Sequence, residues 1–201
     1  MTAAEILKHE HQVILLALRG AEAQANRLAS EIQQATDLIE QMTDFFRNFA
    51  DRCHHAKEEK LLFPRLEQRG IPREGGPVGV MLAEHEQGRA HVRAVAEALP
   101  GARTADPGAV ATVRENLCGY VDLLRQHIDK EDHCLFAMAD QVLSDQDQAE
   151  LVEAFERVEA EEIGEGVHER YHALAHQWAE TSEADSQDRE GECAACHACS
   201  E

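Results

Sequence analysis

One short pattern occurs twice in this chain, and it constrains the fold more than any other feature. The first copy runs from His54 to Phe63 and the second from His127 to Phe136. Both begin with a histidine, carry a glutamate four residues later with a second carboxylate directly after it, and end in Leu-Phe. Because a step of four residues returns to the same face of an α-helix, each copy places an imidazole and a carboxylate one turn apart. Such a pair suits a metal ion, and chance does not readily produce it twice.

Composition and apolar spacing favour helices over strands. Aromatic residues make up 4% of the 201 residues, whereas Ala, Leu, Glu and Gln are plentiful, as is typical of helices. Apolar residues recur at steps of three and four in five segments. We expect helices over residues 3–28, 31–69, 77–99, 107–142 and 145–180.

The ends of these segments carry recognisable start and stop signals. Thr2, Asp106 and Ser144 are predicted N-caps, because a side-chain oxygen there can accept a hydrogen bond from the first turn. Gly70 is expected to end the second helix and Pro100-Gly101 the third.

A wider repeat relates the two halves of the chain. Glu10-His11 precedes His54, and Glu84-His85 precedes His127 at nearly the same distance. Each half therefore predicts a helical hairpin, and two hairpins predict an all-α, up-down four-helix bundle. We expect the bundle over residues 1–142, an additional C-terminal helix packed on it over 143–180, and an acidic tail with cysteines over 181–201.

Six polar side chains fall on the apolar stripes of these helices. Burial of such groups is costly unless they are paired or bound to a metal. A single core histidine is more often a hydrogen-bonded packing residue, but four histidines and two carboxylates in a two-fold pattern predict a metal site. The candidate ligands are His11, His54, Glu58, His85, His127 and Glu131.

The donor set indicates which metal to expect. Imidazoles and carboxylates without thiolate suit iron, with manganese as the less favoured alternative. Two equivalent hairpins predict two ions, which the carboxylates and a bridging oxygen can join. Positions left open on a redox metal would accept O₂, peroxide or NO.

These motifs resemble the hemerythrin-like family, also called HHE cation-binding domains. The resemblance covers residues 3–140 and rests on Glu10-His11, on the stretch from His54 to Pro64, on Glu84-His85 and on His127-x-x-x-Glu131. It implies a four-helix bundle around a non-haem, oxo- or hydroxo-bridged di-iron centre. It also implies terminal ligands at His11, His54, His85 and His127, and bridges at Glu58 and Glu131.

The chain departs from the oxygen-carrying members of that family at one position. They have a His-x-x-x-His pair on the third helix, whereas here His85 is followed at that spacing by Arg89. One terminal ligand is therefore missing or replaced, which argues against reversible oxygen carriage. Asp132 competes with Glu131 as the bridge, and we prefer Glu131 because the repeat aligns it with Glu58.

Other side chains are candidates for the missing ligand. His55 and Glu59 lie about 100° round the helix from the first pair, so we expect them outside the ligand set or exposed. His168 or His172 on the fifth helix is another candidate. The interpretation we prefer there is that Gly164 and Gly166 kink the helix and rotate its buried face.

The net charge, the lack of a long apolar run and the cysteines of the tail restrict the partners and the compartment that we expect. A net charge of −20 disfavours nucleic acid as a partner. No apolar run reaches the ~20 residues of a membrane span, and no signal peptide is visible, so we expect a soluble, cytoplasmic protein with reduced thiols. The tail spacing Cys193-x-x-Cys196-His197, with Cys199, matches haem attachment but lacks an export signal. A soft-metal site or free thiols remain the alternatives there.

Three functions fit these features. We favour a di-iron protein that binds or senses O₂, NO or iron. The alternative is a di-iron enzyme that acts on peroxide, NO or O₂. Iron storage fits less well, because ferritin-like sites use Glu-x-x-His on two separate helices, whereas the two such motifs here share the fifth predicted helix.

Overall fold

The computed structural model of the chain describes residues 1–162 and 166–181, and these residues form helices without any strand. The helical segments are α1 (Ala3–Arg27), α2 (Ile32–Phe45), η1 (Phe46–His55), η2 (Glu58–Leu62), α3 (Phe63–Gln68), α4 (Pro77–Arg103), α5 (Pro107–Lys130), η3 (Glu131–Leu135), α6 (Phe136–Val142) and α7 (Asp145–Glu162). A last helix spans residues 167–181. The segments η1, η2 and η3 are π-helical.

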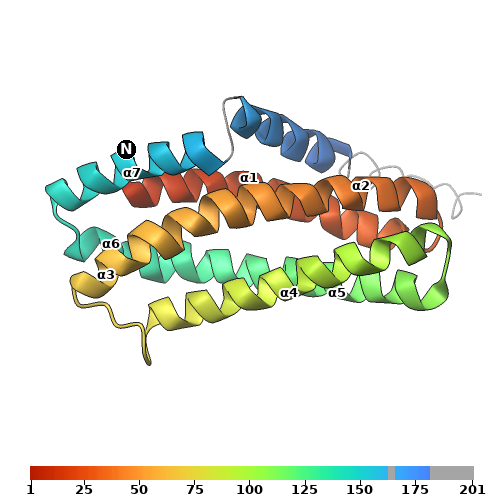
Figure 1. The fold of residues 1–201 in the computed structure, drawn as a ribbon, viewed down its shortest axis with the longest axis horizontal. Coiled ribbons are helices and arrows are strands. Elements are labelled where there is room, and N and C mark those ends of the chain that lie inside the picture. Colours follow the sequence, from red (N-terminus) through yellow and green to blue (C-terminus); the bar gives the residue numbers. More distant parts are fainter. Residues whose placement is uncertain (163–165, 182–201) are drawn as a thin grey trace, which may run out of the picture.

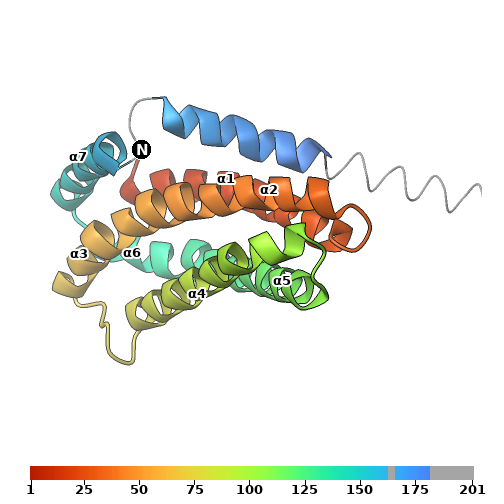
Figure 2. The same cartoon turned by 45° about the vertical axis from the view of Figure 1, so that its right-hand side comes forward.

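Four long rods make up the body of the molecule (Figure 1). The first is α1, the second runs from α2 through α3, the third is α4, and the fourth runs from α5 through α6. The first and third rods each pack against the second and the fourth rod. Consecutive rods run in opposite directions (Figure 2). The predicted all-α, up-down bundle is confirmed.

The predicted N-caps are all present. The hydroxyl of Thr2 accepts a hydrogen bond from the Glu5 N–H, and the Glu5 carboxylate accepts one from the Thr2 N–H. Asp106 accepts a hydrogen bond from the Ala109 N–H at 2.7 Å. Ser144 exchanges hydrogen bonds with Asp147. These contacts satisfy N–H groups that a helix start otherwise leaves without a partner.

The predicted end of the third rod is wrong, because α4 continues through Pro100 to Arg103. A proline costs the helix one backbone hydrogen bond, and Ala102 beyond it is fully buried in the core. Gly101 also lies close to α5, since a Cβ there would be 2.8 Å from the Cβ of Ala109. Packing against α5 therefore keeps this turn helical.

The predicted fifth helix is divided. The helix α7 ends at Glu162, and Gly166 has a positive φ of 76° before the last helix begins. Phe155 is buried on α7, whereas Tyr171 and Trp178 are buried on the last helix, so the buried face changes across the break as we expected. Gly164 lies outside the described residues, as does the whole tail from residue 182 with its cysteines. The last helix lies over α1 and α2 (Figures 1 and 2).

Two clusters of apolar side chains fill the bundle. One, towards the α1–α2 turn, includes Leu18 and Phe45. The other, towards α3 and α6, includes the Leu-Phe pairs of both repeat copies. The repeated His and Glu residues form a polar layer between the clusters. In the described part of the chain, no helix combines the length and apolar character that a membrane span requires.

Candidate metal centre

The two copies of the repeat adopt the same unusual backbone. Glu58 begins η2 and Glu131 begins η3, and in each the N–H of the phenylalanine five residues later donates to the glutamate carbonyl. Such π-helical turns are rare and often occur at functional sites. The Leu-Phe pair behind each turn is buried, so apolar packing anchors the turn while the glutamate points into the bundle.

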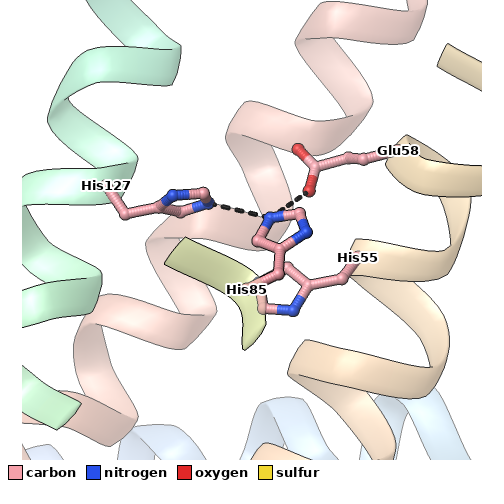
Figure 3. A group of neighbouring side chains, drawn as sticks. All are labelled: His55, Glu58, His85 and His127. Carbon is pink, nitrogen blue, oxygen red and sulfur yellow. Dashed lines mark hydrogen bonds and ion pairs between the residues drawn. The ribbon is translucent and has the colours of Figure 1, made fainter. Parts of the chain in front are cut away.

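One group of candidate ligands combines three imidazoles with one carboxylate. His55, Glu58, His85 and His127 each place one ligand atom within 4.8 Å of the others. They come from the second, third and fourth rods. Glu58 and His127 point towards His85, and the His55 ring stacks on that of His85 (Figure 3). The Nε2 atoms of His85 and His127 are 3.1 Å apart.

The second group combines two imidazoles with two carboxylates. His11, His54, Glu58 and Glu131 also place one ligand atom each within 4.8 Å of the others. Glu58 belongs to both groups, so the two groups are adjacent.

Both glutamates lie between the groups. The carboxylate of Glu58 is 3.6 Å from Nε2 of His54 and 3.5 Å from Nε2 of His85. The Glu131 carboxylate is 3.3 Å from Nε2 of His11 and 3.2 Å from Nε2 of His127. Each glutamate therefore contacts one histidine of each group, an arrangement that lets it serve two cations at once.

Carboxylates outside the centre orient four of the imidazoles. The Nδ1 atoms of His54 and His127 donate to Glu10 and Glu84 at 2.8 and 2.9 Å. Those of His11 and His85 donate to Asp132 and Glu59 at 2.8 and 2.7 Å. Because an ionised carboxylate only accepts, Nδ1 carries a hydrogen, and in the neutral imidazole Nε2 keeps its lone pair for the centre.

These outer partners obey the sequence repeat. Glu10 and Glu84 are the acidic halves of the two Glu-His pairs, and Glu59 and Asp132 are the second carboxylates of the two copies. Sequence reasoning used these residues to find the repeat but assigned Glu10 and Glu84 no part in the site. The repetition itself was the signal, since positions that recur beside ligands commonly support them. The preference for Glu131 over Asp132 agrees with this geometry.

The placement of His55 differs from the expectation. Its side chain is 4% exposed, its ring lies 3.8 Å from that of His85 between centroids, and it belongs to the first group. The π-helical turns of η1 hold more residues per turn than an α-helix, so neighbouring residues diverge by less than 100°. His54 and His55 can therefore both face inward, which makes His55 a candidate for the imidazole that the sequence lacks at Arg89.

The other candidates lie outside both groups. Arg89 forms ion pairs with Asp51 and Glu59. His168 lies near Glu10 and Glu159, where the buried ammonium of Lys57 already pairs with both carboxylates. His172 stacks on His9.

Burial sets the protonation of the imidazoles. It lowers the pKa of His54 to about 4 and, together with neighbouring histidines, those of His55 and His85 to about 3. These three are therefore neutral at pH 7, the form that binds metal. For His127 burial acts in the same direction, but the Glu131 charge outweighs it and raises the pKa to about 9.

Ionising both glutamates at once is energetically unfavourable. Burial, followed by the charge of Glu131, raises the pKa of Glu58 well above its usual value. Burial also acts to raise the pKa of Glu131, but His127 and His11 hold it well below. A cation between the carboxylates would remove this conflict.

Several buried atoms of the centre have no hydrogen-bond partner among the described residues. They are Nε2 of His11, both ring nitrogens of His55, and both carboxylate oxygens of Glu58 and of Glu131. Buried polar atoms are normally satisfied. Here the oxygens of Glu58 and Glu131 lie between the two groups, whereas Nδ1 of His55 faces Asp51 at 3.5 Å. The number and chemistry of the unsatisfied atoms fit a pair of metal cations.

Comparison with known families agrees with this geometry. The family model described as the hemerythrin HHE cation binding domain matches residues 2–139. The chain belongs to the hemerythrin HHE cation-binding family. As in that description, the centre is one for cations, and the match covers all four rods of the bundle.

Curated relatives of this hemerythrin-like chain come from mycobacteria. Uncharacterized protein Mb2018 of Mycobacterium bovis and uncharacterized protein Rv1995 of Mycobacterium tuberculosis are each 27% identical to it over 165 residues. The aligned region covers 82% of this chain and 64% of each relative. The chain thus spans less than two thirds of the length of these relatives. No solved structure matches the chain.

Proposed function

We propose that this protein holds two iron ions and uses them to bind or sense O₂, NO or the iron itself. His55, His85 and His127 would hold one ion, His11 and His54 the other, and Glu58 and Glu131 would bridge them. Iron held in this way supplies a redox-active centre to which small ligands can bind. Manganese is the alternative metal with the same preference for imidazole and carboxylate.

One observation carries this proposal. Two four-residue groups share Glu58, and both carboxylate oxygens of Glu58 and of Glu131 lack a hydrogen-bond partner among the described residues. A single ion would leave one group unsatisfied, which supports two ions. The absence of any thiolate from both groups supports iron over soft metals.

Small ligands have a route towards this centre. A pocket of about 210 Å³ reaches His55 and is also lined by Phe46, Arg89 and Tyr120. Its size suits diatomic or triatomic molecules better than an organic substrate, since sites for drug-sized ligands measure about 300–1,000 Å³. We therefore propose O₂, NO or peroxide as the partner of the centre, and neither nucleic acid nor membrane.

Anaerobic loading with ferrous iron tests the proposal. We expect two irons per chain by elemental analysis, and an optical band that appears with O₂ or NO and disappears when the gas is removed. Glu58→Ala should lose at least one iron, whereas Glu153→Ala, an exposed glutamate of α7, should keep both. Irreversible oxidation without an adduct would overturn O₂ binding, and one or no iron per chain would overturn the di-iron centre.

A di-iron enzyme is the second candidate. Arg47, Arg89 and Arg93 line the same pocket together with Asp51, which pairs with Arg89, and the remaining positive charge can attract peroxide anion or nitrogen oxyanions. The assay is oxygen evolution from peroxide by the iron-loaded protein, with the Glu58→Ala variant beside it. A rate no greater than that of free iron would eliminate catalysis of this kind.

We also place the protein in the cytoplasm. Cys53, Cys118 and Cys134 are free thiols among the described residues, which supports a reducing compartment. Localisation of the tagged full-length protein by fractionation tests this, and recovery from an oxidising compartment would overturn it.

A further inference from the structure

A second set of imidazoles lies outside the centre, on the surface of the bundle. His168, His172 and His176 follow one another at steps of four residues on the last helix, so they share one face. His9 of α1 faces them from the neighbouring rod. The ring centroids of His172 are 5.8 Å from those of His9, 6.0 Å from His168 and 5.4 Å from His176.

These spacings are close to those of imidazoles that share a metal ion. With zinc–nitrogen bonds of about 2.1 Å and tetrahedral angles, the ring centroids of two ligands lie about 5 Å apart. His9, His172 and His176 also line a common pocket of about 620 Å³ together with Gln12. The rings are stacked in this structure, so binding requires them to turn about their side-chain torsions until their nitrogens converge.

The electrostatics of this pocket permit a cation. Burial, followed by the charge of His168 and His176, lowers the pKa of His172, so its lone pair is available at neutral pH. Arg19 and Arg125 also line the pocket, and the charge of Arg125 is compensated by an ion pair with Glu22 at 2.7 Å. The net charge of −20 also raises the local concentration of cations.

We propose that His9, His172 and His176 bind one borderline divalent cation of the zinc type, separately from the centre inside the bundle. Neutral imidazoles are good ligands for zinc, nickel and copper(II), whereas the hard cations magnesium and calcium require oxygen ligands. Water completes the coordination in the open pocket. The bound ion would tie the last helix to α1.

Zinc binding to the iron-loaded full chain tests this site. Cys193, Cys196 and Cys199 are first replaced by serine, so that thiolates of the tail do not compete. Equilibrium dialysis is expected to show one zinc per chain in addition to iron. In His172→Ala and in His176→Ala the affinity should fall by at least about tenfold, while His133→Ala, an exposed histidine elsewhere, should leave it unchanged.

Further measurements separate this site from its alternatives. Hydrogen exchange over residues 167–181 should slow when zinc is added to the parent protein but not to His172→Ala. Cobalt in place of zinc should show the weak visible bands of a site without thiolate. Absence of the extra zinc, or equal zinc affinity in parent and His172→Ala, overturns the proposal. Because iron content is measured separately, failure here leaves the di-iron proposal untouched, and the reverse also holds.

Discussion

His55 is the residue on which the composition of the first ligand group depends. It adds a third imidazole to Glu58, His85 and His127. Its Nδ1 lies 3.5 Å from the Asp51 carboxylate, and its Nε2 has no hydrogen-bond partner in the described chain. Its ring is 5.8 Å from that of His127 between centroids and stacks on that of His85. A purely structural histidine at this depth would be expected to bond a backbone or side-chain group.

Replacement of His55 should therefore weaken one metal position. In His55→Ala we expect the affinity for the second iron to fall by at least about tenfold, which corresponds to about 1.4 kcal/mol, while the first iron stays bound. Stepwise iron titration followed by elemental analysis measures this. His91→Ala is the control, because that histidine bonds Asn116 away from the centre. Two irons bound with parental affinity would show that His55 is not a ligand.

The ion pair between Glu10 and Lys57 lies next to His54, whose Nδ1 donates a hydrogen bond to Glu10. Both side chains are buried and joined by an ion pair, and loss of one partner leaves a buried charge alone. We expect Lys57→Met to destabilise the protein by about 3 kcal/mol in urea unfolding. Lys60→Met, at an exposed position of the same rod, should change the stability by less than about 0.5 kcal/mol, and equal effects would argue against a role for the buried pair.

The same pair makes stability depend on acid. Although burial acts to raise the pKa of Glu10, its bonds to His54 and Lys57 lower that pKa from 4.5 to about 2. A depressed pKa gives stability that is present above about pH 4.5 and is lost as the pH falls towards 2. The contribution is on the order of 3 kcal/mol. The double variant Glu10→Gln/Lys57→Met should show a smaller loss over this range, and parallel pH profiles would contradict the assignment.

At the scale of elements, the sequence predicted the rods well and their π-helical turns not at all. Apolar residues spaced by three and four positions indicate which face of a helix is buried. N-cap residues such as Thr2 and Asp106 indicate where a helix starts. The wider turns at η1, η2 and η3 arise from packing across the bundle, which no local pattern records. For this reason the positions of Glu58 and Glu131 could be predicted, whereas His55 was assigned to the wrong face.

The break in the fifth predicted helix has the same origin. The glycines of the sequence indicated a kink. The division into α7 and a last helix, however, depends on the residues of the bundle that Tyr171 and Trp178 contact. Both rings contact Phe45 edge-on, and Tyr171 donates a hydrogen bond to Asp44 at 2.8 Å. These partners lie more than a hundred residues away along the chain, so the local spacing of apolar residues could not predict the contacts.

Gly20 sets the distance between α1 and the last helix. A Cβ at this position would lie 2.8 Å from the Cβ of Trp178 and 2.9 Å from the methyl group of Met42. We expect Gly20→Ala to push the last helix outward and to destabilise the protein by about 2 kcal/mol. The fluorescence of Trp178, the only tryptophan in the chain, should shift to longer wavelength. Ala173→Ser, at an exposed position, is the control, and an unshifted spectrum in Gly20→Ala would refute the close approach.

At the scale of the whole molecule, the metal centre and the stability of the bundle are coupled. All four rods supply candidate ligands to the centre, and apolar clusters lie on both sides of it. A cation that binds only the folded bundle stabilises it by mass action, by about 2.7 kcal/mol at a hundredfold excess over the dissociation constant. Removal of metal with a chelator should lower the urea midpoint by a corresponding amount.

A variant without the shared carboxylates serves as the comparison. Glu58→Gln/Glu131→Gln no longer carries the two charges that require a cation, so the chelator should not change its urea midpoint. The metal-free parent should also unfold at lower urea than this variant, because unpaired buried carboxylates are costly. Equal chelator effects in both proteins would place the stabilising metal elsewhere.

The ligand groups also determine when during synthesis the protein can acquire its metal. One group requires His127 and the other Glu131, so neither is complete on a ribosome until nearly two thirds of the chain has been made. A nascent hairpin that comprises only the first two rods contains His11, His54 and Glu58. It lacks the residues of the fourth rod that complete the two groups. If the centre holds iron as we propose, we expect loading to follow release of the fourth rod, and products truncated before that rod should not retain iron.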